Sequence, residues 1–441
     1  MRILILTNLF PPHTVTTNDL RCEHVSKLLK LRGHQTLVLT SMHGMRSEQR
    51  DSEVERRLQI NGAFGHPLIT KYSEMKALEQ SNHDALRDVI ARFEPDVIYV
   101  FSLEGLSKSL VFTLRNSKLP TVYDVSDHWL SAEVATDPWL RFWNAPSLSF
   151  LEQSTRAALE LSGERGRLDS TAPTRMGKGY DRLPGLYGSP KERAAVEPNS
   201  LPTFRFDRIF FCSNSLKQLT ENAGFVVRHA DIIHPGIPAA DYIGEIKPTG
   251  SVITKLLVTA PLRVQSGIMT AVQAVKLLRQ STVKVSLTVC GRGDTRYIAE
   301  LRSFVVTNQL PVEFITVTNS IKDMPAIYRR HDAFLHTAEW AEPFPVGPLE
   351  AMACGLPVVG SLSGGAAELL RHGENALVYN PGDAAELASR IQELQLSPAL
   401  RVQMAEAAQA EVLSRFNEST VMDQIENYLN TSMEIWAHTA T

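Results

Sequence analysis

The sequence predicts an α/β protein of two domains, each built on a parallel sheet with helices on its faces. Its 441 residues are too many for one hydrophobic core. Short apolar runs alternate with amphipathic stretches, which is the pattern of parallel strands joined by crossover helices. A stretch rich in glycine and proline, residues 235–250, interrupts this alternation. We therefore place a first domain at 1–238 and a second at 250–419.

The first domain contains apolar runs that we interpret as buried strands. The run at the N-terminus leads directly into Pro11–Pro12 and lacks the core and cleavage site of a signal peptide. Amphipathic helices fit between strands at Asp19–Leu31 and Asp84–Phe93, and the polar stretch Gly163–Pro202 is predicted to be largely loop. The predicted strands are Ile3–Leu6, Thr36–Leu39, Val97–Phe101, Thr121–Tyr123, Arg208–Phe211 and Asp231–Ile233.

The second domain repeats the alternation. Its first apolar run, Leu256–Ala260, follows the linker, and the chain is predicted to be helical from Ala384 onward. The further predicted strands are Val285–Val289, Glu313–Val317, Ala333–Leu335, Pro357–Val359 and Ala376–Val378. Each is short and mostly apolar, as strands buried on both faces of a parallel sheet are.

Composition excludes several classes of protein. A hydrophobic fraction of 43% and a charged fraction of 21% are typical of soluble globular proteins, and a net charge of −3 argues against general nucleic-acid binding. No window approaches the roughly 18–20 apolar residues that span a bilayer. The four cysteines are Cys22, Cys212, Cys290 and Cys354. None has metal-ligand spacing, so we expect reduced, buried thiols in a cytoplasmic protein.

Two glutamates eight residues apart, Glu342 and Glu350, mark the candidate functional site. Three prolines exclude a helix through the first half of the segment between them. Pro348, with Gly347 before it, suits the first helical position, which places Glu350 in the first helical turn. The free N–H groups there suit a phosphate or diphosphate, and the two carboxylates suit sugar and ribose hydroxyls. The alternative is an ordinary first-turn carboxylate and a solvated loop charge.

The string around these glutamates resembles a known motif. Residues Ala351–Val359, Gly364–Gly365 and Glu368 follow the second glutamate. From Glu342 to Glu368, nearly every position matches the donor-site motif of retaining glycosyltransferases of family 4 type, which have the GT-B fold. The resemblance implies two facing Rossmann-like domains with parallel sheets. It also implies a C-terminal helix, here 420–441, that crosses back to the first domain.

The start of the chain resembles the same family. Members open with a strand, then Asn-x-x-Pro-Pro-His, two glycines, an aromatic residue and Glu. The frame is kept through His13, but Thr16 and Thr17 stand at the glycine positions and Asp19 at the Glu position. The resemblance implies that His13, Thr16 and Thr17 form a phosphate or acceptor loop, less open than one made of glycines. The alternative is a simple turn in which Asp19 caps a helix.

The segment Val122–Leu130 resembles the stretch that enters the active site from the first domain in this family. Many members carry His-Asp there, whereas this chain has Ser126 and Asp127, followed by His128. The resemblance implies that Asp127 or His128 contacts the transferred sugar. The alternative is a turn aspartate beside a packed His-Trp pair.

The second domain departs from the family where the donor diphosphate binds. The family places an Arg and a Lys there; Pro261 occupies the Arg position and Ser266 the Lys position. Arg263 is the nearby cation that can substitute. A hydrogen bond to a charged group contributes about 1.5–3 kcal/mol, so losing two would cost a few orders of magnitude in donor affinity without compensation.

By resemblance, the protein is a retaining glycosyltransferase that moves a sugar from a UDP- or GDP-type donor to an acceptor hydroxyl. The absence of a dinucleotide fingerprint and of Asp-x-Asp argues against a nicotinamide cofactor and a metal. Glu342, Asp127 and His128 are the catalytic candidates. The donor-site candidates are Glu350 for the ribose, Arg263 and Ser266 near the diphosphate, backbone near Val317 for the base, and backbone N–H groups of Val346, Gly347 and Leu349 for phosphate.

Two other functions stay open at this point. One is epimerisation of a nucleotide sugar on the same fold. The other is a degenerate protein that binds a sugar or a partner without turnover, which the absence of both cations favours. For the transferase, the acceptor would be a glycan, a lipid-linked sugar or a small molecule and not a nucleic acid. Peripheral contact with the inner face of a membrane stays open.

Overall fold

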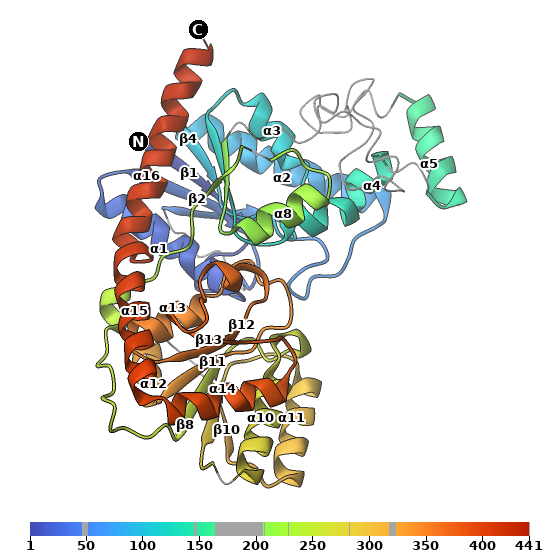
Figure 1. Cartoon of the computed structure of the whole chain (residues 1–441). Coiled ribbons are helices and arrows are strands. Elements are labelled where there is room, and N and C mark those ends of the chain that lie inside the picture. Colours follow the sequence, from blue (N-terminus) through green and yellow to red (C-terminus); the bar gives the residue numbers. More distant parts are fainter. Residues whose placement is uncertain are drawn as a thin grey trace. The chain divides into compact units, whose positions relative to one another are not determined.

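The structure is a computed structural model (Figure 1). It describes residues 1–45, 52–144, 148–163, 206, 208–227, 229–281, 283–316 and 323–440. The chain forms two compact units. Unit 1 comprises Met1–Ile233 and Gln424–Thr441, and unit 2 comprises His234–Asp423.

Unit 1 contains a 7-stranded sheet in the order β3-β2-β1-β4-β5-β6-β7, with each neighbouring pair parallel. The strands are β1 (Arg2–Leu6), β2 (Gln35–Ser41), β3 (Val54–Leu58), β4 (Val97–Val100), β5 (Thr121–Val125), β6 (Arg208–Phe211) and β7 (Asp231–Ile232). Its helices are α1 (Thr17–Leu31), α2 (Tyr72–Phe93), α3 (Leu110–Asn116), α4 (Pro138–Asn144), α5 (Phe150–Leu161) and α8 (Asn214–Asn222). The central strands β1 and β4 are almost wholly buried, which explains their continuous apolar sequences.

Unit 2 contains a 6-stranded parallel sheet in the order β10-β9-β8-β11-β12-β13. The strands are β8 (Lys255–Thr259), β9 (Ser286–Cys290), β10 (Val312–Ile315), β11 (Ala333–His336), β12 (Val358–Ser361) and β13 (Leu377–Tyr379). Its helices are α9 (Ala239–Tyr242), α10 (Ile268–Gln280), α11 (Thr295–Thr307), α12 (Met324–Arg329), α13 (Val346–Ala353), α14 (Ala384–Leu396) and α15 (Pro398–Arg415). Helix α10 packs with α11 and α14, and α13 packs with α9, α12 and α15.

The last helix, α16 (Glu418–Ala440), begins in unit 2 and continues in unit 1. In unit 1 the carboxylate of Glu426 accepts hydrogen bonds from Arg32 (2.8 Å) and pairs with His34 (3.0 Å). The Tyr428 hydroxyl donates to the carbonyl of Ile209 (2.9 Å). The C-terminal helix is therefore part of the packing of unit 1.

The predicted α/β class and parallel sheets are confirmed, and each predicted strand is present with shifts at its ends. The prediction missed β3, because its Glu-Arg-Arg centre hides the alternation of an edge strand. It also started the second helix at Asp84, whereas α2 begins at Tyr72. Polar residues such as Asn82 and His83 interrupt the apolar pattern in the first half of α2, yet their side chains are buried and hydrogen-bonded. Apart from Gly163, the predicted loop Gly163–Pro202 lies outside the described residues.

The four cysteines are buried thiols, as expected. Among the residues that the structure describes, no helix combines the length and the apolar character that a membrane span needs.

Candidate functional site

A pocket in unit 2 lies where β8 and β11 end, at the carboxyl edge of the parallel sheet. Ligands of open α/β sheets bind at this edge. The pocket encloses about 50 Å³ and is lined by Val258, Thr259, Ala260, Pro261, Arg263, Ser266, Leu335, His336, Thr337, Ala338, Trp340, Glu342, Pro345, Gly347 and Pro348. Four of the sequence candidates therefore meet here: Glu342, Arg263, Ser266 and Gly347.

Glycines allow the backbone loops around this pocket to approach one another. A Cβ on Gly364, whose φ is +60°, would lie 2.2 Å from the carbonyl oxygen of Glu342. The N–H of Gly365 donates to the same carbonyl (2.8 Å). On the other side, a Cβ on Gly267 would lie 1.8 Å from the carbonyl oxygen of Thr337. The Gly-Gly pair therefore supports the loop that carries Glu342.

The Glu342 side chain lies in the loop between β11 and α13. Burial raises the pKa of Glu342 to about 7, and the positive charge of Arg263 opposes this rise. Its Oε2 lies 3.8 Å from Nε2 of His336, the last residue of β11. Glu342 is thus not a fully solvated loop charge, and near neutral pH it can exist in either protonation state.

Arg263 is positioned by an aromatic ring. Its guanidinium carbon lies 4.5 Å from the centroid of the Trp340 ring, a cation–π distance. Ser266 is buried, and its carbonyl accepts a hydrogen bond from the Thr337 hydroxyl (2.6 Å). Arg263 is therefore a cation of this pocket, whereas Ser266 and Pro261 bring no charge to the positions they occupy.

Helix α13 begins at Val346, two residues before the predicted start at Pro348. Pro345 is the N-cap, and Pro348 occupies the third helical position, where its missing N–H breaks no intrahelical bond. Val346 and Gly347 hold the first and second helical positions, whose N–H groups have no intrahelical partner, whereas the N–H of Leu349, at the fourth position, is in register for the carbonyl of the N-cap. The start of this helix therefore presents N–H groups next to a pocket that Gly347 lines.

Glu350 is the fifth residue of α13, so its predicted place in the first turn is wrong. Its carboxylate accepts hydrogen bonds from the hydroxyls of Tyr242 (2.8 Å) on α9 and Tyr328 (2.6 Å) on α12. Burial raises the pKa of Glu350, and the two tyrosine hydrogen bonds oppose this rise. Each carboxylate oxygen accepts one bond here and retains capacity for a second.

Asp127 and His128 lie in unit 1, two and three residues after the end of β5 at Val125. The Asp127 carboxylate accepts hydrogen bonds from the Ser102 hydroxyl (2.5 Å) and the Trp129 N–H (2.9 Å). Burial raises the pKa of Asp127 to about 7, and these hydrogen bonds oppose the rise. His128 Nδ1 lies 3.1 Å from the Ser131 hydroxyl, and Trp129 is buried. Both side chains thus take part in local packing and hydrogen bonding.

The loop after β1 leads into α1. Thr16 is the N-cap and Thr17 the first helical residue. The Asp19 carboxylate accepts hydrogen bonds from the N–H of Val15 (2.7 Å) and of Thr16 (2.8 Å), so the capping interpretation of Asp19 is confirmed. His13 packs against Gly44, where a Cβ would lie 2.4 Å from the imidazole.

One candidate, Val317, lies outside the described residues. Within the described residues, no group of three or more His, Cys, Asp or Glu side chains could hold a metal ion. Sequence reasoning missed three partners of the glutamates: His336, Tyr242 and Tyr328. No motif marks them, because they come from separate short elements that only folding brings together.

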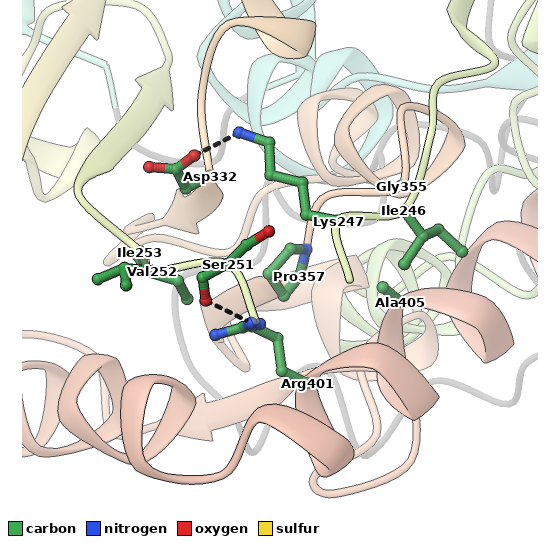
Figure 2. Close-up of a pocket in the computed structure, with 10 residues that line it drawn as sticks. All are labelled: Ile246, Lys247, Ser251, Val252, Ile253, Asp332, Gly355, Pro357, Arg401 and Ala405. Atoms are coloured by element: carbon green, nitrogen blue, oxygen red, sulfur yellow. Dashed lines mark hydrogen bonds and ion pairs between the residues drawn. The ribbon is translucent and has the colours of Figure 1, made fainter. Parts of the chain in front are cut away.

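A second, smaller pocket in unit 2 is a structural clamp (Figure 2). The Lys247 ammonium pairs with Asp332, whose other oxygen accepts from the N–H of Lys255 (2.7 Å). The buried Arg401 guanidinium donates to the carbonyl of Ser251 (2.8 Å). The enclosed space of about 10 Å³ has room for at most one water molecule. These side chains fasten the segment that leads into β8.

A comparison with protein families finds a match within unit 2. Residues 254–411 match the sequence model of the family described as Glycosyl transferases group 1. Over this span the chain is similar to members of that family. The matched span contains every lining residue of the pocket at β8 and β11.

Curated relatives of this chain align over part of their length. Glycogen synthase from Mycobacterium tuberculosis (strain CDC 1551 / Oshkosh) is 28% identical over 218 residues, which are 49% of this chain and 52% of that protein. The amylovoran biosynthesis glycosyltransferase AmsK from Erwinia amylovora is 31% identical over 183 residues, 40% of this chain and 44% of that protein. The chain thus spans about half the length of the curated relatives it matches.

Solved structures match almost the whole chain. HepE from Anabaena, crystallised in complex with UDP-glucose, has a TM-score of 0.64 at 20% identity, covering 98% of this chain and 100% of that chain. Sucrose-phosphate synthase from Thermosynechococcus elongatus has a TM-score of 0.66 at 15% identity, covering 98% of each chain. At these identities the likeness concerns the fold, which is the two-domain α/β fold of GT-B glycosyltransferases.

Proposed function

We propose that this chain is a glycosyltransferase that uses a UDP-sugar donor bound to unit 2. The observation that carries this proposal is the convergence of Glu342, Arg263 and the start of α13 on one pocket. This pocket combines a carboxylate that can accept hydrogen bonds from hydroxyls, a cation and free N–H groups. It lies at the edge of the sheet where nucleotides bind in such folds. HepE, a structural neighbour crystallised with UDP-glucose, supports UDP over GDP as the nucleotide of the donor.

In the proposed reaction the protein positions the donor and stabilises charge. The N–H groups of Val346 and Gly347 bind the diphosphate, because the positive end of the helix favours anions. Arg263 stabilises the charge that develops as the diphosphate leaves. Glu342 accepts hydrogen bonds from sugar hydroxyls, and the free capacity of Glu350 binds the ribose. The backbone near Val317 binds the base.

We further propose that the anomeric configuration is retained and that no metal is required. The departing phosphate oxygen takes the proton of the acceptor hydroxyl on the same face of the sugar, so no protein nucleophile is needed. Unit 1 contributes Asp127 and His128 to contact with the transferred sugar. His13, Thr16 and Thr17 are assigned to its phosphate or acceptor loop. The acceptor is a glycan, a lipid-linked sugar or a small molecule.

Titration calorimetry with UDP, GDP, UDP-glucose and GDP-glucose tests the donor proposal. We expect UDP and UDP-glucose to bind without added metal, and Glu350→Gln to lower turnover roughly tenfold to a thousandfold, as loss of an oriented polar contact does. Exposed Glu300 on α11 provides the matched control Glu300→Gln. Unchanged turnover in correctly folded Glu350→Gln protein would contradict the assignment of the site.

A second candidate is a protein that binds a nucleotide sugar without transferring it. The observation that favours it is the uncharged pair Pro261 and Ser266 in the pocket lining. Binding of UDP-glucose with neither hydrolysis nor transfer over a panel of acceptors would support this candidate. Interconversion of the sugar in the absence of acceptor would instead indicate an epimerase.

A further inference from the structure

His336 has an unusual position at the end of β11. It is buried, with 7% of its surface exposed, and lines the pocket that holds Glu342. Its Nε2 forms no hydrogen bond with any described residue. A buried polar atom without a partner costs free energy, so its retention requires an explanation.

The surroundings of the ring restrict the possible partners. A Cβ added to Gly360, the β12 residue paired with His336, would lie 3.3 Å from His336 Cβ, so the strand leaves little room on that side. Among described residues, the titratable or charged groups that face Glu342 are His336, on β11, and Arg263, on the loop after β8. Because Nε2 is itself buried, the Glu342 carboxylate 3.8 Å away is the partner within reach.

We propose that His336 is a positioning residue for Glu342, donating a hydrogen bond from Nε2–H to one oxygen of the ionised carboxylate. A movement of roughly 1 Å would bring the pair to hydrogen-bond distance. The second oxygen then faces the pocket and accepts from a ligand hydroxyl. The identity of this ligand as a sugar nucleotide rests on the proposed function; the pairing itself does not.

The charge state of the imidazole agrees with this role. Burial lowers the pKa of His336 to about 4, so the ring is neutral near pH 7 and carries one N–H. A neutral donor stabilises an ionised carboxylate without cancelling its charge. Glu342 can therefore keep its charge for the ligand while its orientation is held by His336.

Two variants separate hydrogen bonding from packing. His336→Phe keeps a ring of similar shape and removes the donor, whereas His336→Gln keeps an N–H near the position of Nε2. The matched control is His331→Gln, because His331 is also buried in unit 2 but pairs its Nδ1 with the carbonyl of Ile327 (2.7 Å). Circular dichroism verifies the fold of each variant.

The first measurement is a carboxyl ¹³C NMR titration of Glu342 in the ligand-free protein. In His336→Phe we expect the midpoint to rise by about one to two pH units, since hydrogen bonds to charged groups contribute about 1.5–3 kcal/mol. In His336→Gln the midpoint of the Glu342 titration is expected to stay within about half a pH unit of wild type. In the His331→Gln control this midpoint should not change. An unchanged midpoint in His336→Phe, or equal midpoints in the Phe and Gln variants, would overturn the proposal.

The second measurement compares UDP-glucose with UDP by calorimetry at pH 7. We expect His336→Phe to weaken UDP-glucose roughly tenfold and UDP by less than about threefold, because only the sugar is assigned to Glu342. Equal losses for both ligands would contradict the role of the pair in sugar recognition. If the wild-type protein bound neither ligand, the proposed function would fail, while the NMR titration would still decide on the His336–Glu342 pair.

Discussion

Replacing Glu342 by Gln is expected to stabilise unit 2 above neutral pH while it weakens ligand binding. Burial holds the pKa of Glu342 at about 7 against an ordinary value of 4.5. Between these two pH values the unfolded chain releases the proton that the folded protein keeps. Stability therefore falls as pH rises from about 4.5 to about 7, and the loss stays constant above that.

The size of this loss follows from the same two values. The difference between about 7 and 4.5 corresponds to at most about 3 kcal/mol, because one pKa unit is 1.36 kcal/mol and the side chain is partly exposed. Glutamine carries no titrating proton, so Glu342→Gln lacks this pH dependence. Relative to wild type, the variant should gain roughly 2–3 kcal/mol in unfolding free energy between pH 4.5 and pH 8.

The assay is urea unfolding at pH 4.5 and at pH 8, monitored by ¹⁹F NMR of protein labelled with 5-fluorotryptophan. Trp340 is the tryptophan of unit 2, so its signal reports on that unit. Glu300→Gln, an exposed glutamate on α11 of the same unit, is the control for loss of one charge. The reasoning is refuted if wild type and Glu342→Gln lose stability in parallel as pH rises.

Five further outcomes are expected. Arg263→Gln should weaken UDP binding roughly tenfold to a hundredfold, and Trp340→Leu about two- to fivefold, both by calorimetry. Ser266→Lys, which restores a cation, should tighten UDP binding; unchanged affinity would place the diphosphate elsewhere. Tyr328→Phe should lower the unfolding free energy of unit 2 by about 1–3 kcal/mol in urea, as a buried donor is lost. Arg401→Met should cost about 1–3 kcal/mol and leave UDP affinity unchanged.

The sequence was informative about the fold because parallel sheets impose a strong local pattern. Strands such as Ile3–Leu6 are buried on both faces and therefore read as continuous apolar runs. The apolar pattern did not reveal elements that are buried on one side only or that bury polar side chains. The edge strand β3 and the first half of α2, with its buried Asn82 and His83, were both missed.

For the candidate site, the sequence alone determined that Glu342 and Glu350 flank a loop leading into a helix, and that Pro261 and Ser266 bring no charge where the family has cations. Only the tertiary structure decided what surrounds these residues. Helix α13 can start at Val346, because proline at the third helical position loses no intrahelical hydrogen bond. Glu350 therefore lies beyond the first turn, where its carboxylate accepts hydrogen bonds from two tyrosine hydroxyls. His336 meets Glu342 because β11 ends at the pocket, and burial then shifts the pKa of each. Such pairings join residues through the fold, so no spacing along the chain encodes them.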